Sequence, residues 1–381
     1  MRALRAAAAD QRSDTSSGPG PEVSIVVCIR NGADEVEAWA EAVRACRGVA
    51  FEVVAVDDGS SDSTPDRLVA AAARWEPGRF RIVRVEGTAP GKREALAAGV
   101  EAARAEVVLA TDIDCRPLGP TWVEAMTEPL RTGRADVVAG VCLPVLLAAG
   151  EGRNLAGWMQ LADDLRIARS YVAAVGLGWP YMTVGRNVAF RRELALAVKA
   201  PPPPGVASGD DDLAFQAWLR ARPGLRVLAD PRPEASAATR PAPTVAAWAR
   251  RKRRHLTTAP HYPPAVLLRL AVSPTALATA AGCAAAAIAT APSDVVHTAL
   301  GIVAGAVLAA WLVQTFTLQA FARTAGLNGR AVCAGAAMPA VAGVLRGLVA
   351  IAAVRAGLKG RWTPTEPLKS TRRRPAVDPW T

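Results

Sequence analysis

The sequence predicts an α/β domain, with a mostly parallel sheet and helices on both faces, followed by C-terminal membrane helices. Between Val23 and Ala110, β-branched apolar runs alternate with segments of helical periodicity, an order typical of parallel sheets. Between Ala265 and Val354, the chain is almost free of charged residues, as membrane segments are. A length of 381 residues is enough for a full buried core.

Four buried strands are expected in the first third of the chain. Each is a short apolar run that ends in polar or turn-forming residues, and helical segments follow the first three. The expected strands are Val23–Ile29, Phe51–Val56, Phe80–Val85 and Val107–Ala110. The expected helices are Ala33–Cys46, a helix that opens at Ser63 or Thr64 with Pro65 in its first turn, and Gly91–Ala103.

The second part of the domain is less regular. We expect a helix at Leu155–Arg169, a strand near Val188–Phe190 and a last helix at Thr244–His255. A rigid connector, Pro201–Pro204, leads to an acidic cluster, Asp210–Asp212, which precedes a further short helix.

The chain divides into four expected parts. Residues 1–21 lack a long apolar core and are predicted to be a disordered leader. Residues 22–262 form the α/β domain, residues 263–355 the membrane region, and residues 356–381 a basic cytoplasmic tail.

Three apolar segments make up the expected membrane region, and each exceeds the ~20 residues that a spanning helix needs. They are Ala265–Ala291, Val295–Phe321 and Ala331–Val354. The positive-inside rule places both the loop with Arg323 and Arg330 and the basic tail inside, which three full spans cannot satisfy. We therefore expect two spanning helices plus a third spanning, interfacial or re-entrant segment. The alternative is a buried hydrophobic domain.

The basic residues and the cysteines narrow the function classes. The formal net charge is +11, but its clusters, Arg250–Arg254 and Arg372–Arg374, flank the apolar region, so membrane lipids and not nucleic acid are the expected partners. The six cysteines show no paired spacing, which excludes a recognisable zinc, redox or disulfide pattern. We expect a multi-pass protein of the cell (inner) membrane with a cytoplasmic α/β domain.

Polar side chains follow three of the predicted strands at the point where each strand ends. Open α/β sheets bind their ligands along this edge, so these side chains predict a binding site. They are Arg30 and Asn31, Asp57 and Asp58, and Asp112 and Asp114.

The pair Asp112 and Asp114 suggests a divalent cation. Two carboxylates at alternate positions can hold a hard cation whose remaining sites are filled by a diphosphate, and the cation neutralises the charge of a diphosphate leaving group. The alternative is a solvated turn. Lys92, at the start of a helix, could approach a phosphate or remain a surface lysine.

Three further groups of residues are candidates. Asp57 or Asp58 could accept hydrogen bonds from a nucleoside, or form only a turn and a helix cap. A member of the Asp210–Asp212 cluster could act as a general base, or these residues could simply favour a helix N-terminus. Arg254 and His255 could reach a diphosphate or an acceptor, whereas the rest of that basic run could bind lipid.

These motifs, taken in order, resemble glycosyltransferase family 2, the large group that includes cellulose, chitin and hyaluronan synthases. The resemblance covers about Pro21 to Tyr262. It is carried by Val23–Val27 with Arg30-Asn31, by Asp57-Asp58-Gly59-Ser60-Ser61-Asp62, by Gly91-Lys92 with Ala95-Leu96, by Asp112-x-Asp114 and by Gly209-Asp210-Asp211.

The resemblance implies a GT-A fold and an inverting transferase that uses a nucleotide-diphospho-sugar and Mg²⁺ or Mn²⁺. Asp57 and Asp58 would contact the nucleoside, and Asp112 and Asp114 the metal and diphosphate. Asp211 aligns best with the base, and a one-residue shift would select Asp210. Arg30, Asn31 and Lys92 would complete the donor site.

The chain departs from the family pattern near the membrane. The synthases carry Gln-x-x-Arg-Trp, and here the matching run, Arg251–His255, keeps Arg254 but replaces Gln and Trp, which puts processive polymerisation in doubt. The stretch Gly178–Phe190 resembles the acceptor-side segment, with Asn187 as its candidate residue. The alternative is a strand and loop that pack on the core.

The expected function is the transfer of one sugar from a nucleotide donor, with a UDP-sugar as the expected donor, to a lipid-like, glycan or otherwise membrane-associated acceptor. The alternatives are a processive polysaccharide synthase, a nucleotidyltransferase that releases pyrophosphate, and an inactive membrane-tethered nucleotide-sugar-binding homologue.

Overall fold

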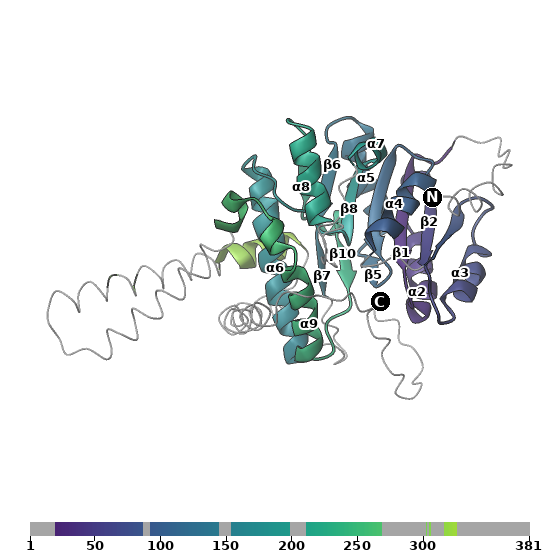
Figure 1. Cartoon of the computed structure of the whole chain (residues 1–381), viewed down its shortest axis with the longest axis horizontal. Coiled ribbons are helices and arrows are strands. Elements are labelled where there is room, and N and C mark those ends of the chain that lie inside the picture. Colours follow the sequence, from purple (N-terminus) through teal and green to yellow (C-terminus); the bar gives the residue numbers. More distant parts are fainter. Residues whose placement is uncertain are drawn as a thin grey trace.

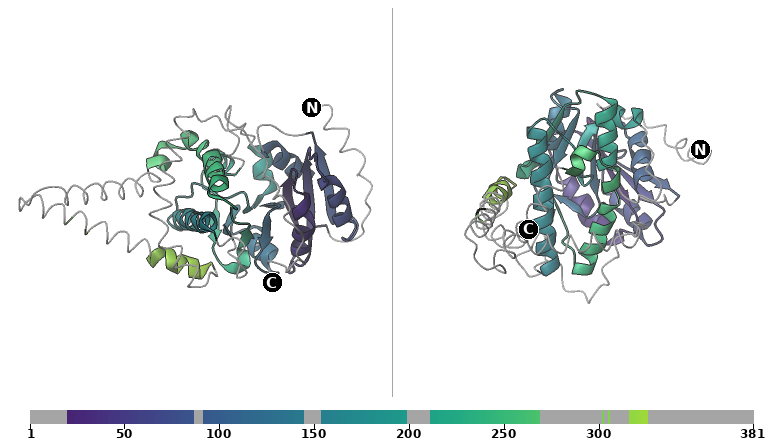
Figure 2. Two further views of the ribbon diagram at one scale, coloured as in Figure 1. Left: turned by 90° about the horizontal axis from the view of Figure 1, so that it is seen from below. Right: turned by 60° about the vertical axis from the view of Figure 1, so that its left-hand side comes forward.

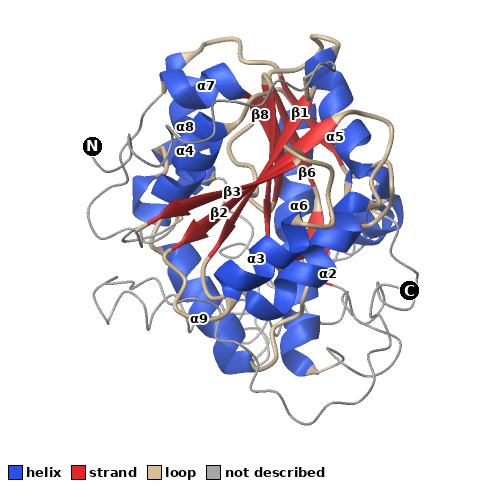
Figure 3. Ribbon diagram, turned by 90° about the vertical axis from the view of Figure 1, so that its right-hand side faces the viewer, coloured by secondary structure: helices blue, strands red, loops and turns tan. Residues whose placement is uncertain are grey.

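The structure, a computed structural model, describes residues 20–86, 92–144, 154–198, 211–268, 302, 305 and 316–325. Its centre is a twisted sheet with helices on both faces, and a smaller sheet lies beside it (Figures 1 and 3). The expected α/β architecture is confirmed.

The central sheet of the described chain has seven strands in the order β3-β2-β1-β4-β8-β6-β9. All neighbouring strands are parallel except β8, which runs antiparallel to both β4 and β6. The strands are β1 (Val23–Ile29), β2 (Phe51–Asp58), β3 (Phe80–Val85), β4 (Val107–Asp112), β6 (Val137–Gly140), β8 (Asn187–Arg191) and β9 (Val227–Asp230).

The alternation of side chains along β1 shows why both faces are covered, because successive residues of a strand point to opposite faces. Val23, Ile25, Val27 and Ile29 pack against the first group of helices, and Val26 packs on the opposite face. The first face carries α2 (Ala33–Arg44), α3 (Thr64–Ala72) and α5 (Trp122–Arg131). The second carries α4 (Arg93–Ala102), α7 (Arg192–Ala197) and α8 (Asp212–Ala221).

Two longer helices pack beside this core. They are α6 (Leu155–Gly176) and α9 (Val245–Leu256), and α9 is followed by the short helix η2 (Ala259–His261). Between α6 and α9 lies an ion pair that joins Lys252 to the fully buried Asp163. The smaller sheet has the order β5-β10-β7, formed by β5 (Cys115–Pro117), β10 (Ala237–Thr239) and β7 (Cys142–Pro144), and η1 (Pro233–Ala235) precedes β10.

Most predicted boundaries lie within a few residues of the observed ones, with two informative differences. Strands β2 and β4 continue through Asp58 and Asp112, because these residues still pair with β3 and β1. Helix α6 extends seven residues beyond the expected end at Arg169 and stops before Gly178, whose φ of +75° suits a glycine.

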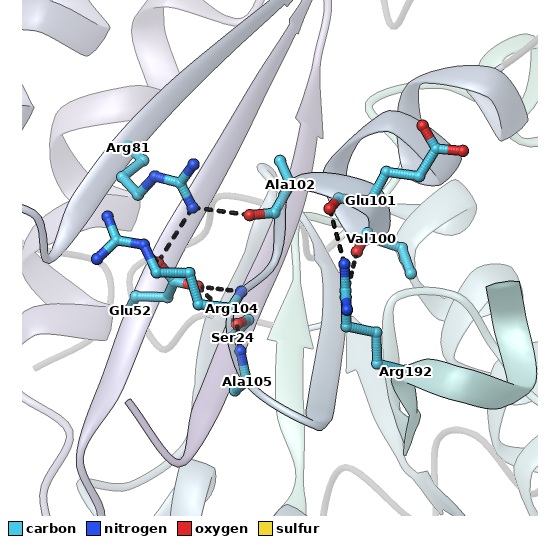
Figure 4. A network of polar contacts seen from close by, with 9 residues as sticks. All are labelled: Ser24, Glu52, Arg81, Val100, Glu101, Ala102, Arg104, Ala105 and Arg192. Carbon is cyan, nitrogen blue, oxygen red and sulfur yellow. Dashed lines mark hydrogen bonds and ion pairs between the residues drawn. The ribbon is translucent and has the colours of Figure 1, made fainter. Parts of the chain in front are cut away.

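At the amino ends of the strands, polar groups form a closely satisfied network (Figure 4). The buried carboxylate of Glu52 accepts hydrogen bonds from Ser24 Oγ (2.8 Å) and the Arg104 backbone N–H (2.7 Å), and it pairs with Arg81. The guanidinium of Arg81 also donates to the Ala102 carbonyl, at the end of α4. Arg192 donates to the Val100 and Glu101 carbonyls, so two arginines cap this helix end.

No helix in the described part of the chain is long and apolar enough to cross a membrane. The third apolar segment, the leader up to residue 19 and the basic tail lie outside the described residues, as does most of the first two apolar segments. The described part of the second segment packs beside α6 (Figure 2). There, Leu318 and Ala322 join a buried cluster that also contacts Val266, from the start of the first apolar segment.

Candidate active site

The carboxyl ends of β2, β1 and β4 meet at one edge of the central sheet. Asp57 is level with Ile29 of β1, and Asp112 is level with Cys28 on the other side of the same strand. Two inter-strand spacings separate them, roughly 10 Å. The structure therefore brings the predicted nucleoside-side and diphosphate-side carboxylates to one edge, on either side of β1.

The loops after β1 and β2 are linked by hydrogen bonds. Asn31 adopts a φ of +54°, and its side-chain oxygen accepts from the Ser61 backbone N–H (2.8 Å). The Asn31 and Gly32 backbone N–H groups donate to the hydroxyls of Ser60 and Thr64 (2.9 Å each). The described contacts of Asn31 thus shape the loops, and direct contact with a nucleotide remains a prediction.

Both carboxylates at the end of β2 are almost completely buried. Asp57 Oδ1 accepts from the Ser60 backbone N–H (3.1 Å), and Arg30 lies 3.9 Å from Asp58 Oδ2. Buried carboxylates at a loop-covered sheet edge can accept hydrogen bonds from a nucleobase or a ribose.

The end of β4 carries a close ion pair. Lys92 Nζ lies 2.5 Å from Asp112 Oδ1, although the two residues come from different elements. Lys92 directly precedes α4, so its charge lies at a helix N-terminus, where anions are favoured. The predicted phosphate ligand and the predicted metal ligand are therefore neighbours.

Asp114 lies in the turn between β4 and β5. Its carboxylate accepts a hydrogen bond from Thr239 Oγ1 (3.3 Å) on β10 and lies 3.5 Å from Cys115 Sγ. Burial raises the pKa of Asp114, but the nearby cations Arg251 and Arg186 outweigh it and hold that pKa below its usual range. The carboxyl group is therefore ionised at neutral pH.

These donors fit a hard divalent cation. Asp112 and Asp114 offer carboxylate oxygens, which Mg²⁺ and Mn²⁺ prefer. In the described residues, no three His, Cys, Asp or Glu side chains converge into a metal-binding group. A two-carboxylate set leaves coordination sites for diphosphate oxygens and water.

Sequence reasoning missed Arg186, which follows Gly185 directly before β8. It lies 3.5 Å from Asp164 on α6. Burial lowers its pKa, but Asp164 and the groups around Asp114 raise that pKa well above its usual value, so Arg186 is always charged. The sequence signal for Arg186 is its position within the Gly178–Phe190 stretch, where Asn187 is the candidate residue.

The structure corrects the assignment of Asn187. This side chain is fully buried and accepts a hydrogen bond from Trp122 Nε1 (3.0 Å). Its amide group donates to the Val141 and Ala235 carbonyls (2.9 and 2.8 Å). Both amide hydrogens are therefore used inside the fold, and Asn187 joins the two sheets and does not face a ligand.

Asp211 directly precedes α8 and is held by two backbone amides. Its carboxylate accepts from the Gly185 N–H and the Asp212 N–H, at 2.8 Å each. A Cβ at position 185 would lie 3.0 Å from the Asp211 Cβ, so a larger residue there would press on the Asp211 side chain. Asp210, the alternative base, lies outside the described residues.

The basic run of α9 divides into different roles. Arg251 is close enough to Asp114 to lower its pKa. Lys252 is buried in its ion pair with Asp163, so the expectation that it binds lipid is wrong. Arg254 is half-buried. His255 keeps some solvent exposure, but desolvation by the surrounding protein and then the charge of Arg254 hold its pKa well below its usual range. Its imidazole is therefore neutral at pH 7.

The twisted, mostly parallel sheet and the paired carboxylates at one of its edges agree with the GT-A fold that the sequence motifs suggest. Residues 24–195 match the family described as "Glycosyl transferase family 2". This match supports the family assignment that the sequence motifs suggest for the α/β domain.

Two groups of known proteins illustrate the similarity. A glucosyl-3-phosphoglycerate synthase of Mycolicibacterium paratuberculosis is 31% identical over 189 residues, which cover 47% of this chain and 56% of the relative. An undecaprenyl-phosphate 4-deoxy-4-formamido-L-arabinose transferase of Serratia proteamaculans is 32% identical over 99 residues, or 25% of this chain and 30% of the relative. The chain thus spans only part of the length of these relatives.

A solved structure supports the fold alone. It is a mannosyltransferase from Pyrobaculum calidifontis in complex with GDP-Man and Mn²⁺, with a TM-score of 0.52 and 22% identity. The comparison covers 84% of this chain and 87% of the mannosyltransferase.

Proposed function

We propose that this glycosyltransferase moves a sugar, with inversion, from a nucleotide-diphospho-sugar to an acceptor hydroxyl, and that it requires Mg²⁺ or Mn²⁺. One observation carries the proposal: Asp57, Asp58, Asp112 and Asp114 share one sheet edge, and Asp211 is anchored to Gly185, next to Arg186 whose charge acts on Asp114. In this proposal, Asp57 and Asp58 bind the donor nucleoside, Asp112 and Asp114 serve the leaving diphosphate, and Asp211 serves the acceptor.

On the donor side, Asp57 and Asp58 would accept hydrogen bonds from the nucleoside. Asp112 and Asp114 would hold the divalent cation, which supplies neutralisation of the leaving diphosphate when bound. Lys92 and Arg251 would add fixed positive charge on the same side, where negative charge grows as the bond to the sugar breaks.

On the acceptor side, Asp211 would take the proton of the acceptor hydroxyl as its oxygen attacks the anomeric carbon. The bond between that carbon and the diphosphate oxygen breaks on the opposite side, so the products are an inverted glycoside and a nucleoside diphosphate. The two backbone N–H groups at Asp211 favour its ionised form, which is the form that a base needs.

We propose a lipid-like, membrane-associated acceptor. The support is that the apolar C-terminal part contacts the catalytic domain: Val266 and Leu318 join one cluster on α6. We also propose that two segments span the membrane and that the catalytic domain lies on its cytoplasmic side.

A second acceptor class is a small phosphorylated acid. Arg186 supplies a permanent positive charge beside the base, and one relative is named glucosyl-3-phosphoglycerate synthase. A phosphate on a lipid would use the same arginine, so the experiment below contains both acceptors.

The test is nucleoside diphosphate release by the detergent-purified chain across a panel of UDP-, GDP- and other sugar nucleotides, with Mg²⁺, Mn²⁺ or EDTA. Polyprenyl phosphate and 3-phosphoglycerate serve as acceptors in parallel. We expect release with one donor, stimulated by the lipid acceptor and lost with EDTA. Stimulation by 3-phosphoglycerate alone would overturn the lipid assignment. Absence of nucleoside diphosphate release with every donor would overturn the transferase mechanism.

A further inference from the structure

Asp212, the residue after Asp211, is contacted by two hydroxyl groups from the segment that follows α9. Asp212 is the first residue of α8, and its side chain is buried. One carboxylate oxygen accepts from the Leu213 backbone N–H (2.8 Å). The other accepts from the hydroxyl of Tyr262 and lies 3.0 Å from the hydroxyl of Thr258.

Both hydroxyls belong to the segment that follows α9. Thr258 Oγ1 also lies 2.8 Å from the His255 carbonyl, and its single hydrogen can serve only one of the two acceptors at a time. Tyr262 is therefore the dedicated donor to Asp212. Burial and the charge of Asp212 raise the pKa of Tyr262, so its hydroxyl is protonated at neutral pH and can donate.

This contact reaches the site through the backbone. The Asp212 N–H donates to Asp211 Oδ1, so the position of residue 212 sets the orientation of the neighbouring carboxylate. Tyr262 in turn directly precedes Pro263 and the turn that brings Val266 into the cluster on α6. The base and the chain that leads to the apolar region are thus joined by one side-chain pair.

We propose that Tyr262 is a positioning residue that acts through Asp212, with help from Thr258, to fix the Asp211 carboxylate towards the acceptor. The inference rests on the proposed role of Asp211 as the base. It explains the run of adjacent aspartates without assigning all of them to catalysis: Asp211 faces the reaction, and Asp212 ties its helix to the chain that leads to the apolar region.

The test compares Tyr262→Phe with Tyr171→Phe in the full-length chain. Tyr171 is a second buried tyrosine, and its hydroxyl donates to the Gly140 carbonyl (2.7 Å) and not to the Asp212 carboxylate. We expect Tyr262→Phe to lower kcat roughly tenfold or more while the donor KM stays within about twofold, since misplacement of a reacting group reduces turnover and not donor binding. Tyr171→Phe should retain the wild-type kcat.

A second pair of variants keeps the test decisive if Tyr262→Phe folds poorly. Thr258→Ser retains the hydroxyl and should keep kcat, whereas Thr258→Val should lower it. In a double-mutant cycle, Asp212→Asn and Tyr262→Phe should be strongly non-additive, because each removes the same contact.

The outcomes separate the inference from the proposed function. If the wild type transfers sugar and folded Tyr262→Phe keeps its kcat, the positioning role is overturned and the transferase mechanism stands. An equal loss of kcat in Tyr171→Phe would also overturn it, since any buried hydroxyl would then matter as much. If the wild type itself transfers nothing, the proposed function fails first.

Discussion

The two ends of β2 put buried carboxylates to opposite uses. At the amino end, Glu52 is surrounded by Ser24, Arg81 and Arg104, and Arg81 also caps the end of α4 (Figure 4). At the carboxyl end, Asp57 and Asp58 are equally buried, but they stand beside the loops that follow β1 and β2. The amino end stabilises the fold, and the carboxyl end lies at the proposed donor site.

The comparison extends across the sheet. Strand β6 begins next to Asp136, another buried carboxylate held by arginines, at the same edge as Glu52. Strand β4 ends in Asp112, whose partner Lys92 comes from the adjacent helix start. A buried carboxylate is therefore not a functional signal by itself. What distinguishes the two sets is the edge of the sheet, because open α/β sheets bind their ligands at the carboxyl ends of the parallel strands.

The largest effect should come from Asp211→Asn. An amide cannot take the acceptor proton, so transfer should fall about 10²- to 10⁴-fold. Donor binding, measured by calorimetry, should stay near the wild-type value because Asp211 touches the acceptor side. Full transfer by this variant would move the base to another residue.

Removal of the divalent cation should have the next largest effect. EDTA should abolish nucleoside diphosphate release, and Mg²⁺ or Mn²⁺ should restore it. Asp114→Asn should lower release about 100-fold at a fixed metal concentration, since the leaving diphosphate loses a ligand of its counter-ion. Release that persists in EDTA would show that Lys92 and the arginines suffice.

Glu52→Gln should affect stability and leave catalysis intact. The variant loses the charge that Arg81 and Arg104 require, which should lower the free energy of unfolding by about 3 kcal/mol. Denaturant titration measures this loss, and kcat per folded molecule should not change. A matched loss of kcat with unchanged stability would mean that the amino edge contributes to the reaction.

Asp136 should give a smaller, pH-dependent contribution to stability. The side-chain hydrogen bond from Arg226 lowers its pKa from 3.8 to about 2, so its stabilisation is complete above pH 4 and is lost as the pH falls towards 2. The difference in unfolding free energy between wild type and Asp136→Asn should therefore shrink by about 2 kcal/mol between pH 5 and pH 2. A constant difference across this range would contradict the assigned pKa.

The carboxyl edge could be predicted from sequence because its signals are local. Each of the first four strands is rich in β-branched or other apolar residues, and the residues that follow it in the chain also follow it in space. Parallel pairing then brings Asp57 and Asp112 to one edge without any further information.

The acceptor side could not be predicted in the same way. The charges of Arg186 and Arg251 act on Asp114 only because β8 inserts antiparallel beside β4 and α9 folds back on α6, and neither event has a local signal. Asn187 shows the reverse problem. Its polar side chain suggested contact with a ligand. In the structure, the same amide group forms hydrogen bonds with Trp122 and with two backbone carbonyls where the two sheets meet.

The most direct test of the whole account is calorimetric donor binding by two variants on one strand, Asp58→Asn and Glu52→Gln, with the divalent cation present. The account predicts that Asp58→Asn weakens donor binding about tenfold or more, because an NH₂ donor and a neutral amide replace one acceptor oxygen and the negative charge of the buried carboxylate, while Glu52→Gln binds the donor as the wild type does. Equal affinity in Asp58→Asn and the wild type, or equal weakening in both variants, would contradict the division of the sheet into a binding edge and a structural edge.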